Sequence, residues 1–456
     1  MNPLLIKNSR LVTEKGILQS DLLIEKGKIS QIGKNINLFG KVKKIEGKGL
    51  YTMPGVIDPH VHLELNAYNS NSSDDFYTGS LAAAGGGVTT FIDFAIPEKG
   101  QTMSHRIKEK KISAKEKSII DYSFHAQIIN WEDNIPEQME AVSNMGITSF
   151  KIFMPATEGW GVDAGGLYEA LKYSKQIDSL IMVHAENGEI ADHLTKKLVK
   201  NGKTRMTNYS RARPSFIEKL AVVEAALVAQ EAQTPVYICH LSSGKAAIEI
   251  MKLKNSGQHI FVETTPQYLT LDNSKFSQKN SYLYACCPPI RDKKETYQIW
   301  RALLEGDIDT VGTDHCPFLK SEKEAGKGDF TKTPFGLPGV ENSLPLLYTE
   351  GVVKRSLSME DIYEMISLNP AKIFGLYPEK GTLQKGTDAD LVVFNPAKKV
   401  KLKADNLLGN CDWSPYENKV VAGYPEYTIS RGEIIYKKGN IPQQIQKGRG
   451  NFLKRK

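Results

Sequence analysis

The chain has 456 residues, of which 40% are hydrophobic and 24% charged, a composition typical of a folded protein with more than one domain. The formal net charge is +7, but the last sixteen residues hold five basic residues and no acid, which leaves +2 for the rest. This distribution argues against a nucleic-acid-binding face. No apolar run approaches the roughly 18 residues of a membrane span.

Two further features bear on where the protein works. The first sixteen residues lack the apolar core and cleavage site of a signal peptide. Five cysteines without a CxxC spacing exclude a disulfide scaffold and a zinc ribbon. Together these features predict a protein of the reducing cytoplasm.

In chain order, the first elements are short strands with alternating apolar residues, at 4–12 (LLIKNSRLV) and 21–33 (DLLIEKGKISQIG). The same style returns at 388–396 (DADLVVFNP) and in a hairpin at 427–440. Neither end is large enough for a core of its own. We therefore expect residues 1–53 and 376–440 to form one composite β-sandwich domain.

Between these ends, the pattern changes to apolar runs followed by helical stretches, such as 242–253 and 293–304. Eight runs are predicted to be strands: Val56–Asp58, Thr89–Phe94, Tyr122–Ile128, Ser149–Met154, Leu180–Val183, Val236–Cys239, Ile260–Val262 and Thr310–Gly312. This alternation predicts a (β/α)8 barrel over residues 54–375. A doubly wound sheet is the alternative, but no G-x-G-x-x-G follows a strand. The basic tail, 441–456, is expected to be a flexible or subunit-contacting extension.

Imidazoles and one carboxylate follow the predicted strands, where a barrel places its active site. His60, His62, His184 and His240 each come at or just after a strand end, and Asp314 follows the last strand. Residues i and i+2 of an extended chain point to one side, so His60 and His62 can bind one metal ion. Ligands of this kind suit Zn, Mn, Co or Fe. His315, the neighbour of Asp314, should point away from the metal.

Lys151 lies inside the fourth predicted strand, within the apolar stretch TSFKIFM. A buried ammonium group beside metal ions is disfavoured, so the side chain either reaches solvent, pairs with an acid or is chemically modified. A neutral amine reacts with carbon dioxide to form a carbamate, whose two oxygens can bridge two cations. We therefore interpret Lys151 as a candidate N6-carboxylysine.

Long motifs along residues 1–440 resemble the amidohydrolase superfamily and its hydantoinase and dihydropyrimidinase branch. They include PGVIDPHVHLEL, AAAGGGVTTFIDF, SFKIFM, VHAENG, ICHLSSGKA, ETTPQYLTLD, TDHCPF and PFGLPGVEN. The resemblance implies two divalent ions, with zinc favoured, and a hydroxide between them. His60, His62 and Asp314 would bind one ion, His184 and His240 the other, and carboxylated Lys151 would bridge both.

The same resemblance implies a reaction and an assembly. Hydroxide would attack the carbonyl carbon of a cyclic amide, and Asp314 would pass its proton to the leaving nitrogen. The ring of a small cyclic ureide would open to an N-carbamoyl amino acid. Homotetramers or dimers are expected, with no nucleic acid or membrane as partner.

Three substrate-contact positions depart from the pattern of this branch. Ala156 stands where a Tyr usually donates a hydrogen bond to the oxyanion, Cys287 where Ser is usual, and Phe335 where Asn is usual. Thr157 or the indole of Trp160 is hypothesised to replace the missing donor. The expected substrate contacts are Ala156, Thr157, Trp160, Cys287, Phe335 and Gly336.

Other functions remain as alternatives. Dihydroorotases place an Arg after the second His of the first strand, where this chain has Leu63 and Glu64. An allantoinase, or a cyclic amidohydrolase with another substrate, is a closer alternative. Some relatives are non-enzymatic scaffolds that resemble enzymes with lost metal ligands, whereas all six candidate ligands are present here.

Overall fold

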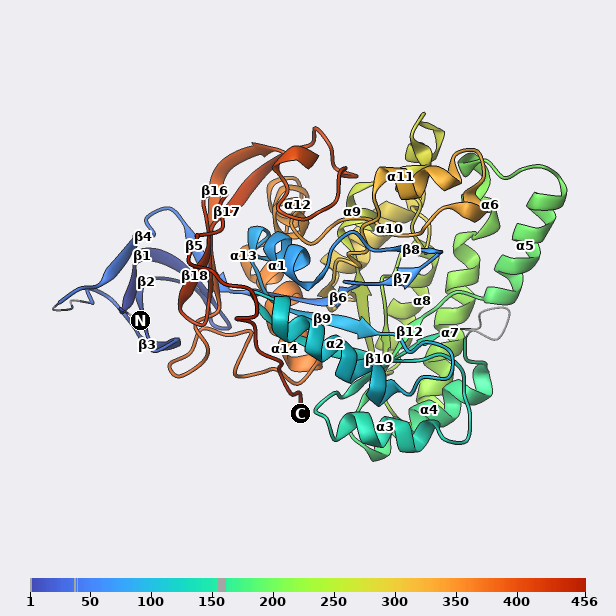
Figure 1. Cartoon of the computed structure of the whole chain (residues 1–456), viewed down its shortest axis with the longest axis horizontal. Helices are drawn as coiled ribbons and strands as arrows, with labels where there is room; N and C mark the ends of the chain where they lie inside the picture. Colours follow the sequence, from blue (N-terminus) through green and yellow to red (C-terminus); the bar gives the residue numbers. More distant parts are fainter. Residues whose placement is uncertain (1, 37, 39, 155–160) are drawn as a thin grey trace.

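The computed structural model describes residues 2–36, 38, 40–154 and 161–456. A barrel with helices around it occupies the right-hand part of Figure 1, and a sheet made from both ends of the chain lies on the left. No helix in these described ranges combines the length and apolar character needed to cross a membrane.

Eight parallel strands form the barrel, one for each predicted run. They are β6 (Val56–Val61), β9 (Val88–Ala95), β10 (Asp121–Ile128), β11 (Ser149–Phe153), β12 (Leu180–His184), β13 (Val236–Ile238), β14 (Ile260–Thr264) and β15 (Thr310–Val311). Neighbours in sequence are neighbours in the sheet, from β6 round to β15. A parallel bridge between Val61 and His315 brings the two ends together. The predicted barrel is therefore confirmed.

Helices follow the strands, and most of them cover the barrel from outside, whereas α12 and α13 contact the terminal sheet. They are α1 (Phe76–Gly85), α2 (Met103–Lys117), α3 (Ile135–Ser143), α4 (Ala164–Gln176), α5 (Gly188–Lys200), α6 (Tyr209–Ala212), α7 (Ser215–Ala232), α8 (Gly244–Asn255), α9 (Pro266–Thr270), α10 (Lys293–Leu304), α11 (Lys320–Lys323), α12 (Ser343–Leu347), α13 (Met359–Tyr363) and α14 (Asn369–Ile373). Because helices cover the outside, barrel strands such as β9 and β10 are buried along their whole length.

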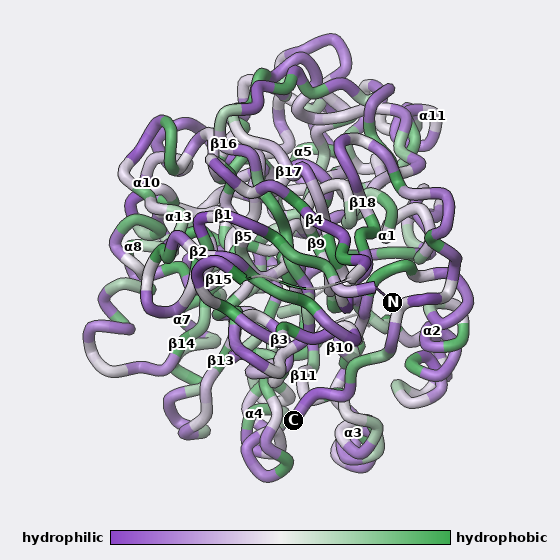
Figure 2. The backbone as a smooth tube through the Cα atoms, turned by 90° about the vertical axis from the view of Figure 1, so that its left-hand side faces the viewer, coloured by the Kyte–Doolittle hydropathy of each residue, from purple (hydrophilic) through white to green (hydrophobic). Residues whose placement is uncertain are grey.

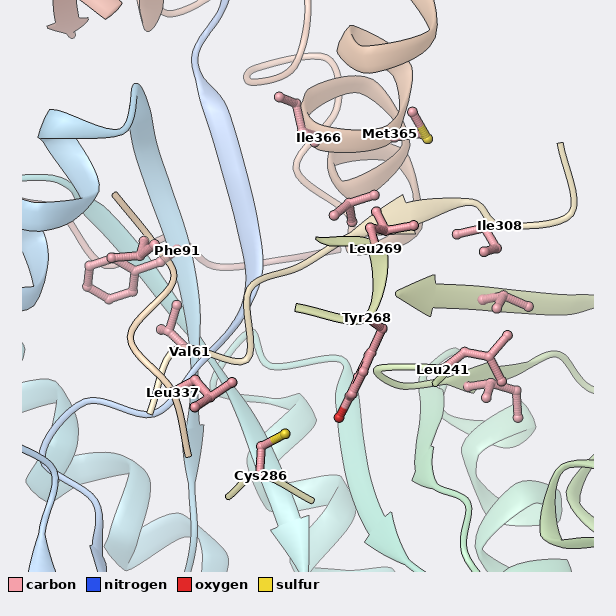
Figure 3. Close-up of a cluster of buried hydrophobic side chains, with 14 of the residues drawn as sticks. Val61, Phe91, Leu241, Tyr268, Leu269, Cys286, Ile308, Leu337, Met365 and Ile366 are labelled. Carbon is pink, nitrogen blue, oxygen red and sulfur yellow. The ribbon is translucent and has the colours of Figure 1, made fainter. Parts of the chain in front are cut away.

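The main core lies between the strands and these helices. Figure 3 shows part of it, where Val61, Phe91 and Leu337 lie close to one another and Tyr268 and Leu269 project from one short segment. Hydrophobic stretches gather toward the middle of the molecule in Figure 2, and many outer loops are hydrophilic.

The terminal sheet combines β1 (Leu4–Thr13), β2 (Gly16–Glu25), β3 (Lys28–Gly33), β4 (Lys43–Glu46) and β5 (Tyr51–Pro54) with β16 (Leu391–Lys401), β17 (Val420–Ser430) and β18 (Glu433–Lys437). β5 joins the two halves, since it pairs with β1 on one side and β16 on the other. A separate cluster that includes Ile6, Leu22, Leu391 and Ile429 is buried on this sheet. The composite domain is confirmed, and we propose boundaries at residues 53/54 and 375/376.

The basic tail is not the flexible extension that its composition predicts. The backbone of Asn451 and Leu453 hydrogen-bonds to Tyr122 of β10. The side chain of Arg455 is only 3% exposed and donates to the hydroxyl of Ser123 and the carbonyl of Phe124. The expectation of a flexible tail was wrong because the tail's partner, the barrel strand β10, is far away in sequence. The alternative of a contact between subunits stays a prediction.

Candidate functional site

The first group of predicted ligands meets at one end of the barrel, as expected. His60 and His62 lie at the end of β6, and Asp314 follows β15. Oδ1 of Asp314 lies 3.2 Å from Nε2 of His60 and 3.1 Å from Nε2 of His62. Burial opposes ionisation of Asp314, but the two imidazoles outweigh this effect and hold the pKa of the carboxyl well below its usual value. One carboxylate oxygen and two imidazole nitrogens therefore face a common point.

The second group lies beside the first. His184 ends β12, and His240 lies two residues beyond β13. Nδ1 of His184 faces Nε2 of His240 at 3.1 Å, and the rings of His60 and His240 have centroids 5.4 Å apart. The four imidazoles and Asp314 thus form one cluster.

Two residues of this cluster hold strained backbone conformations. His240 has φ of 35° and Asp314 has φ of 50°, in the left-handed region that side chains with a Cβ rarely adopt. Such conformations cost on the order of 1–3 kcal/mol each and persist where the surroundings enforce them. Strain at both residues fits a site built for function.

Lys151 lies on β11 beneath this cluster. It is only 1% exposed, and its Nζ has no hydrogen-bond partner among the described residues. The rings of Phe94 and Phe153 lie 5.3 and 5.4 Å from Nζ. Within the described part of the chain, Lys151 therefore neither reaches solvent nor pairs with an acid.

A cavity of about 350 Å³ connects these groups. It is lined by His60, His62, Leu65, Asn66, Ala67, Tyr68, Ile96, Lys151, Phe153, His184, His240, Cys287, Asp314, Cys316, Phe335 and Gly336. The predicted contacts Cys287, Phe335 and Gly336 therefore line it. Ala156, Thr157 and Trp160 lie outside the described residues.

The donors present suit divalent metal ions. Burial lowers the pKa of His62 to about 4, and burial and Lys151 hold the pKa of His240 well below its usual value. Burial also opposes a charge on His60, but Glu263 and Asp314 outweigh it and raise the pKa of His60 to about 9. Neutral imidazole is the form that binds metal. His60, His62 and Asp314 bring their ligand atoms within 4.8 Å of one another. The amine of Lys151 is buried without a hydrogen-bond partner among the described residues, and a negative charge at this position would compensate it.

Two buried carboxylates orient imidazoles of the predicted ligand set, and neither carboxylate was predicted. Glu263 at the end of β14 accepts hydrogen bonds from Nδ1 of His60 (2.7 Å) and from the backbone N–H of His240 (2.9 Å). Glu186 lies 3.0 Å from Nε2 of His184. A carboxylate on one ring nitrogen fixes the other for metal binding. The sequence signal that could have identified them was an acidic residue at a strand end, Glu263 in ETTPQYL and Glu186 in VHAENG.

His315 points away from the cluster, as its position next to Asp314 predicted. Its Nε2 lies 3.1 Å from Asp74, and its Nδ1 accepts the N–H of Gly339 at 3.0 Å. Both of its ring nitrogens therefore face groups outside the cluster, and it supports the segment that follows Gly336.

Glu341 lies in the GVEN motif, two residues after Gly339. Its carboxyl leads to a prediction about how stability depends on pH. Burial raises the pKa of its carboxyl to about 8. Between about pH 4.5 and 8 the folded chain keeps a proton that the unfolded chain has lost, so the free energy of unfolding falls as pH rises. Glu341→Gln should match the wild type at pH 5 and exceed it by on the order of 2 kcal/mol at pH 8.5, as measured by denaturant unfolding in chelator.

Glu350→Gln provides the matched control with the opposite sign. Burial opposes ionisation of Glu350, but Lys419 and Lys354 outweigh it and lower its pKa. The Glu350 carboxylate therefore stabilises the folded protein at pH values above its pKa in the unfolded chain, and this stabilisation is lost in acid. At pH 8.5, Glu350→Gln should be less stable than the wild type. A pH-independent difference for Glu341→Gln would contradict the assignment.

Comparisons with known proteins agree with this geometry. Residues 51–434 match the amidohydrolase family. The chain is 38% identical to a D-hydantoinase of Geobacillus stearothermophilus, over 99% of this chain and 96% of the relative. It is 34% identical to a D-phenylhydantoinase of Escherichia coli K12, over 99% of this chain and 98% of the relative.

Solved structures give the same result. A D-hydantoinase crystal structure superposes with a TM-score of 0.96 at 37% identity, over 100% of this chain and 99% of that one. The L-hydantoinase (dihydropyrimidinase) of Arthrobacter aurescens gives 0.91 at 31% identity, with both chains fully covered. The chain therefore belongs to the amidohydrolase family, in its hydantoinase and dihydropyrimidinase branch.

Proposed function

We propose that this enzyme hydrolyses a cyclic ureide of the hydantoin or dihydropyrimidine type and opens its ring to an N-carbamoyl amino acid. The observation that carries the proposal is the convergence of four imidazoles, Asp314 and an unpartnered Lys151 on one cavity. Full-length relatives named as D-hydantoinases support it.

The metal centre follows from the donors. We propose two divalent ions, with zinc favoured and Mn, Co or Fe as alternatives, and a carbon dioxide-derived carbamate on Lys151. His60, His62 and Asp314 would hold one ion, and His184 and His240 the other. Divalent ions held there would polarise the carbonyl and make hydroxide available at neutral pH.

The chain's own residues position the reactants. The carboxylate of Asp314 accepts the proton of the attacking water and returns it to the leaving nitrogen, so the C–N bond breaks, the attacked carbon becomes a carboxyl group and the nitrogen becomes part of a neutral carbamoyl group. Glu263 and Glu186 keep His60 and His184 in their orientations. Arg213 in turn holds Glu186, with Nη1 at 2.5 Å from its Oε2.

A substrate panel tests the proposal. Metal-loaded protein should open hydantoin, 5-substituted hydantoins or dihydrouracil, and Asp314→Asn should lose that activity. Appreciable hydrolysis of dihydroorotate would contradict it, because Leu63 and Glu64 provide no cation for a ring carboxylate. Preference for allantoin would favour the allantoinase alternative. Protein purified without chelator should contain about two ions per chain, and near-zero metal would support the scaffold alternative.

Assembly and location are part of the same proposal. We expect a homotetramer or dimer, because Phe216, Leu220 and Leu227 are exposed apolar side chains on the outer helix α7. All five cysteines are free, which supports a location in the reducing cytoplasm.

A further inference from the structure

Attack on a carbonyl moves negative charge onto its oxygen, and a neutral hydrogen-bond donor at that oxygen lowers the barrier. The described lining of the cavity consists of the metal-binding cluster, apolar side chains, Asn66, two thiols and one hydroxyl. Tyr68 is the only Ser, Thr or Tyr among the lining residues that the structure describes. Cys287, Cys316 and Asp314 lie close enough to its hydroxyl to act on it electrostatically.

The backbone holds Tyr68 in a conformation that its residue type disfavours. Tyr68 and Asn69 form the tip of a hairpin between β7 (Asn66–Ala67) and β8 (Ser70–Asn71), with φ of 58° and 56°. Two-residue turns with both φ positive favour Asn and Gly. A bulky residue there costs on the order of 1–3 kcal/mol, so this outlier indicates a function for the side chain.

Hydrogen bonds of the residues on both sides of the tip support this conformation. The N–H of Ser72 donates to the carbonyl of Leu65 at 2.8 Å, and the N–H of Leu65 donates to the Ser72 hydroxyl at 2.9 Å. The hydroxyl of Ser70 donates to Glu322 at 2.5 Å. These hydrogen bonds hold the residues that flank the tip.

Aromatic packing then aims the ring. The Tyr68 ring meets Phe335 edge to face, with centroids 5.6 Å apart at 88°, and meets Phe318 at 6.2 Å and 73°. Phe335 is stacked on Tyr209 at 5.2 Å, and the Tyr209 hydroxyl is anchored on the carbonyl of Cys286. Tyr68 itself remains 52% exposed, so one side of its ring is open.

We propose that the hydroxyl of Tyr68 donates a hydrogen bond to the substrate carbonyl oxygen under attack. This inference rests on the proposed ring-opening function. As the new C–O bond forms, the carbonyl π electrons move onto that oxygen, and the Tyr68 O–H stabilises them without losing its proton. When the carbonyl reforms, the C–N bond breaks and the nitrogen leaves with the proton carried by Asp314. The exposed fraction of Tyr68 describes the whole residue, whereas the surroundings of its hydroxyl are desolvated; this desolvation and the thiol of Cys287 raise the pKa of the phenol, which keeps it a donor at working pH.

Tyr68→Phe tests the proposal, because it keeps the ring contacts and removes only the hydroxyl. We expect kcat to fall by on the order of 10²-fold, as for other oxyanion donors, with KM changed less than threefold and the melting temperature unchanged. Tyr297→Phe is the matched control, since Tyr297 is 63% exposed on α10. Tyr68→Leu removes ring and hydroxyl together and should raise KM as well.

The outcomes separate the inference from the function on which it rests. A Tyr68→Phe variant with kcat within twofold of the wild type would overturn the inference alone. The inference would also be overturned if Thr157→Ala or Trp160→Phe lost turnover while Tyr68→Phe kept it, because the donor role would then belong to Thr157 or Trp160. A wild-type protein that is loaded with metal but opens no ring of the panel would overturn the proposed function itself.

Discussion

Replacing Lys151 by methionine should abolish metal binding and lower kcat/KM by at least about 10³-fold, yet leave the metal-free protein no less stable than the wild type. The two effects have one cause. The Nζ of Lys151 is buried and has no partner among the described residues. Its desolvation costs free energy in the metal-free protein, and methionine of similar volume removes that cost. With metal present, the same substitution removes the proposed bridging anion.

Lys110→Met is the matched control for stability. Lys110 is also buried, but its Nζ donates to Asp93 at 2.5 Å and to the carbonyl of Leu63 at 2.6 Å. Removing it leaves the buried Asp93 carboxylate unpaired, which costs about 3–5 kcal/mol. The two lysine variants should therefore shift the melting temperature in chelator in different directions.

Metal content and unfolding in chelator are the measurements that check this prediction. Full occupancy of two ions in Lys151→Met would contradict the bridging role. A large loss of stability in the metal-free variant would contradict the account of an unpaired amine. In Lys151→Ala, added acetate or bicarbonate should restore part of the metal content, because a free carboxylate can fill the space left by the side chain.

The barrel and its ligands could be predicted because they depend on local pattern. Each strand is a short run of apolar residues bounded by turns, and strands buried on both faces need no alternation. The ligand side chains follow those runs at fixed places, and Lys151 interrupts one of them. Once the runs are ordered in a parallel barrel, the strand ends must meet at one rim.

The supporting residues could not be predicted in this way. Glu263 and Glu186 gain their roles from contacts between strands, which strand order alone does not specify. Tyr68 is placed by a hairpin of two-residue strands, which is too short for any periodic signal. Arg455 and its neighbours lack an amphipathic pattern, because their hydrogen bonds go to the barrel strand β10 and not to a local partner.

Deleting residues 451–456 should lower the free energy of unfolding by about 3–5 kcal/mol, since buried backbone groups left without partners cost about 1–3 kcal/mol each. The lost partners are those of the Tyr122 N–H, the Phe124 carbonyl and the Gly146 carbonyl. The ring of Phe452, which packs on Phe124 with centroids 6.0 Å apart, is lost as well. Denaturant unfolding in chelator measures the difference.

Single substitutions show which residues of the segment 451–456 stabilise the protein. Lys454→Ala should leave stability unchanged, because that side chain is exposed. Arg455→Ala should destabilise the protein, whereas Arg455→Met should cost less, since Nη1 of Arg455 is buried without a described partner and its neutral replacement keeps the volume. If the truncated chain unfolded at the same denaturant concentration as the full chain, the segment would be a passive extension after all. A loss confined to the truncated chain and Arg455→Ala would instead establish that the segment stabilises the barrel through its contacts with β10.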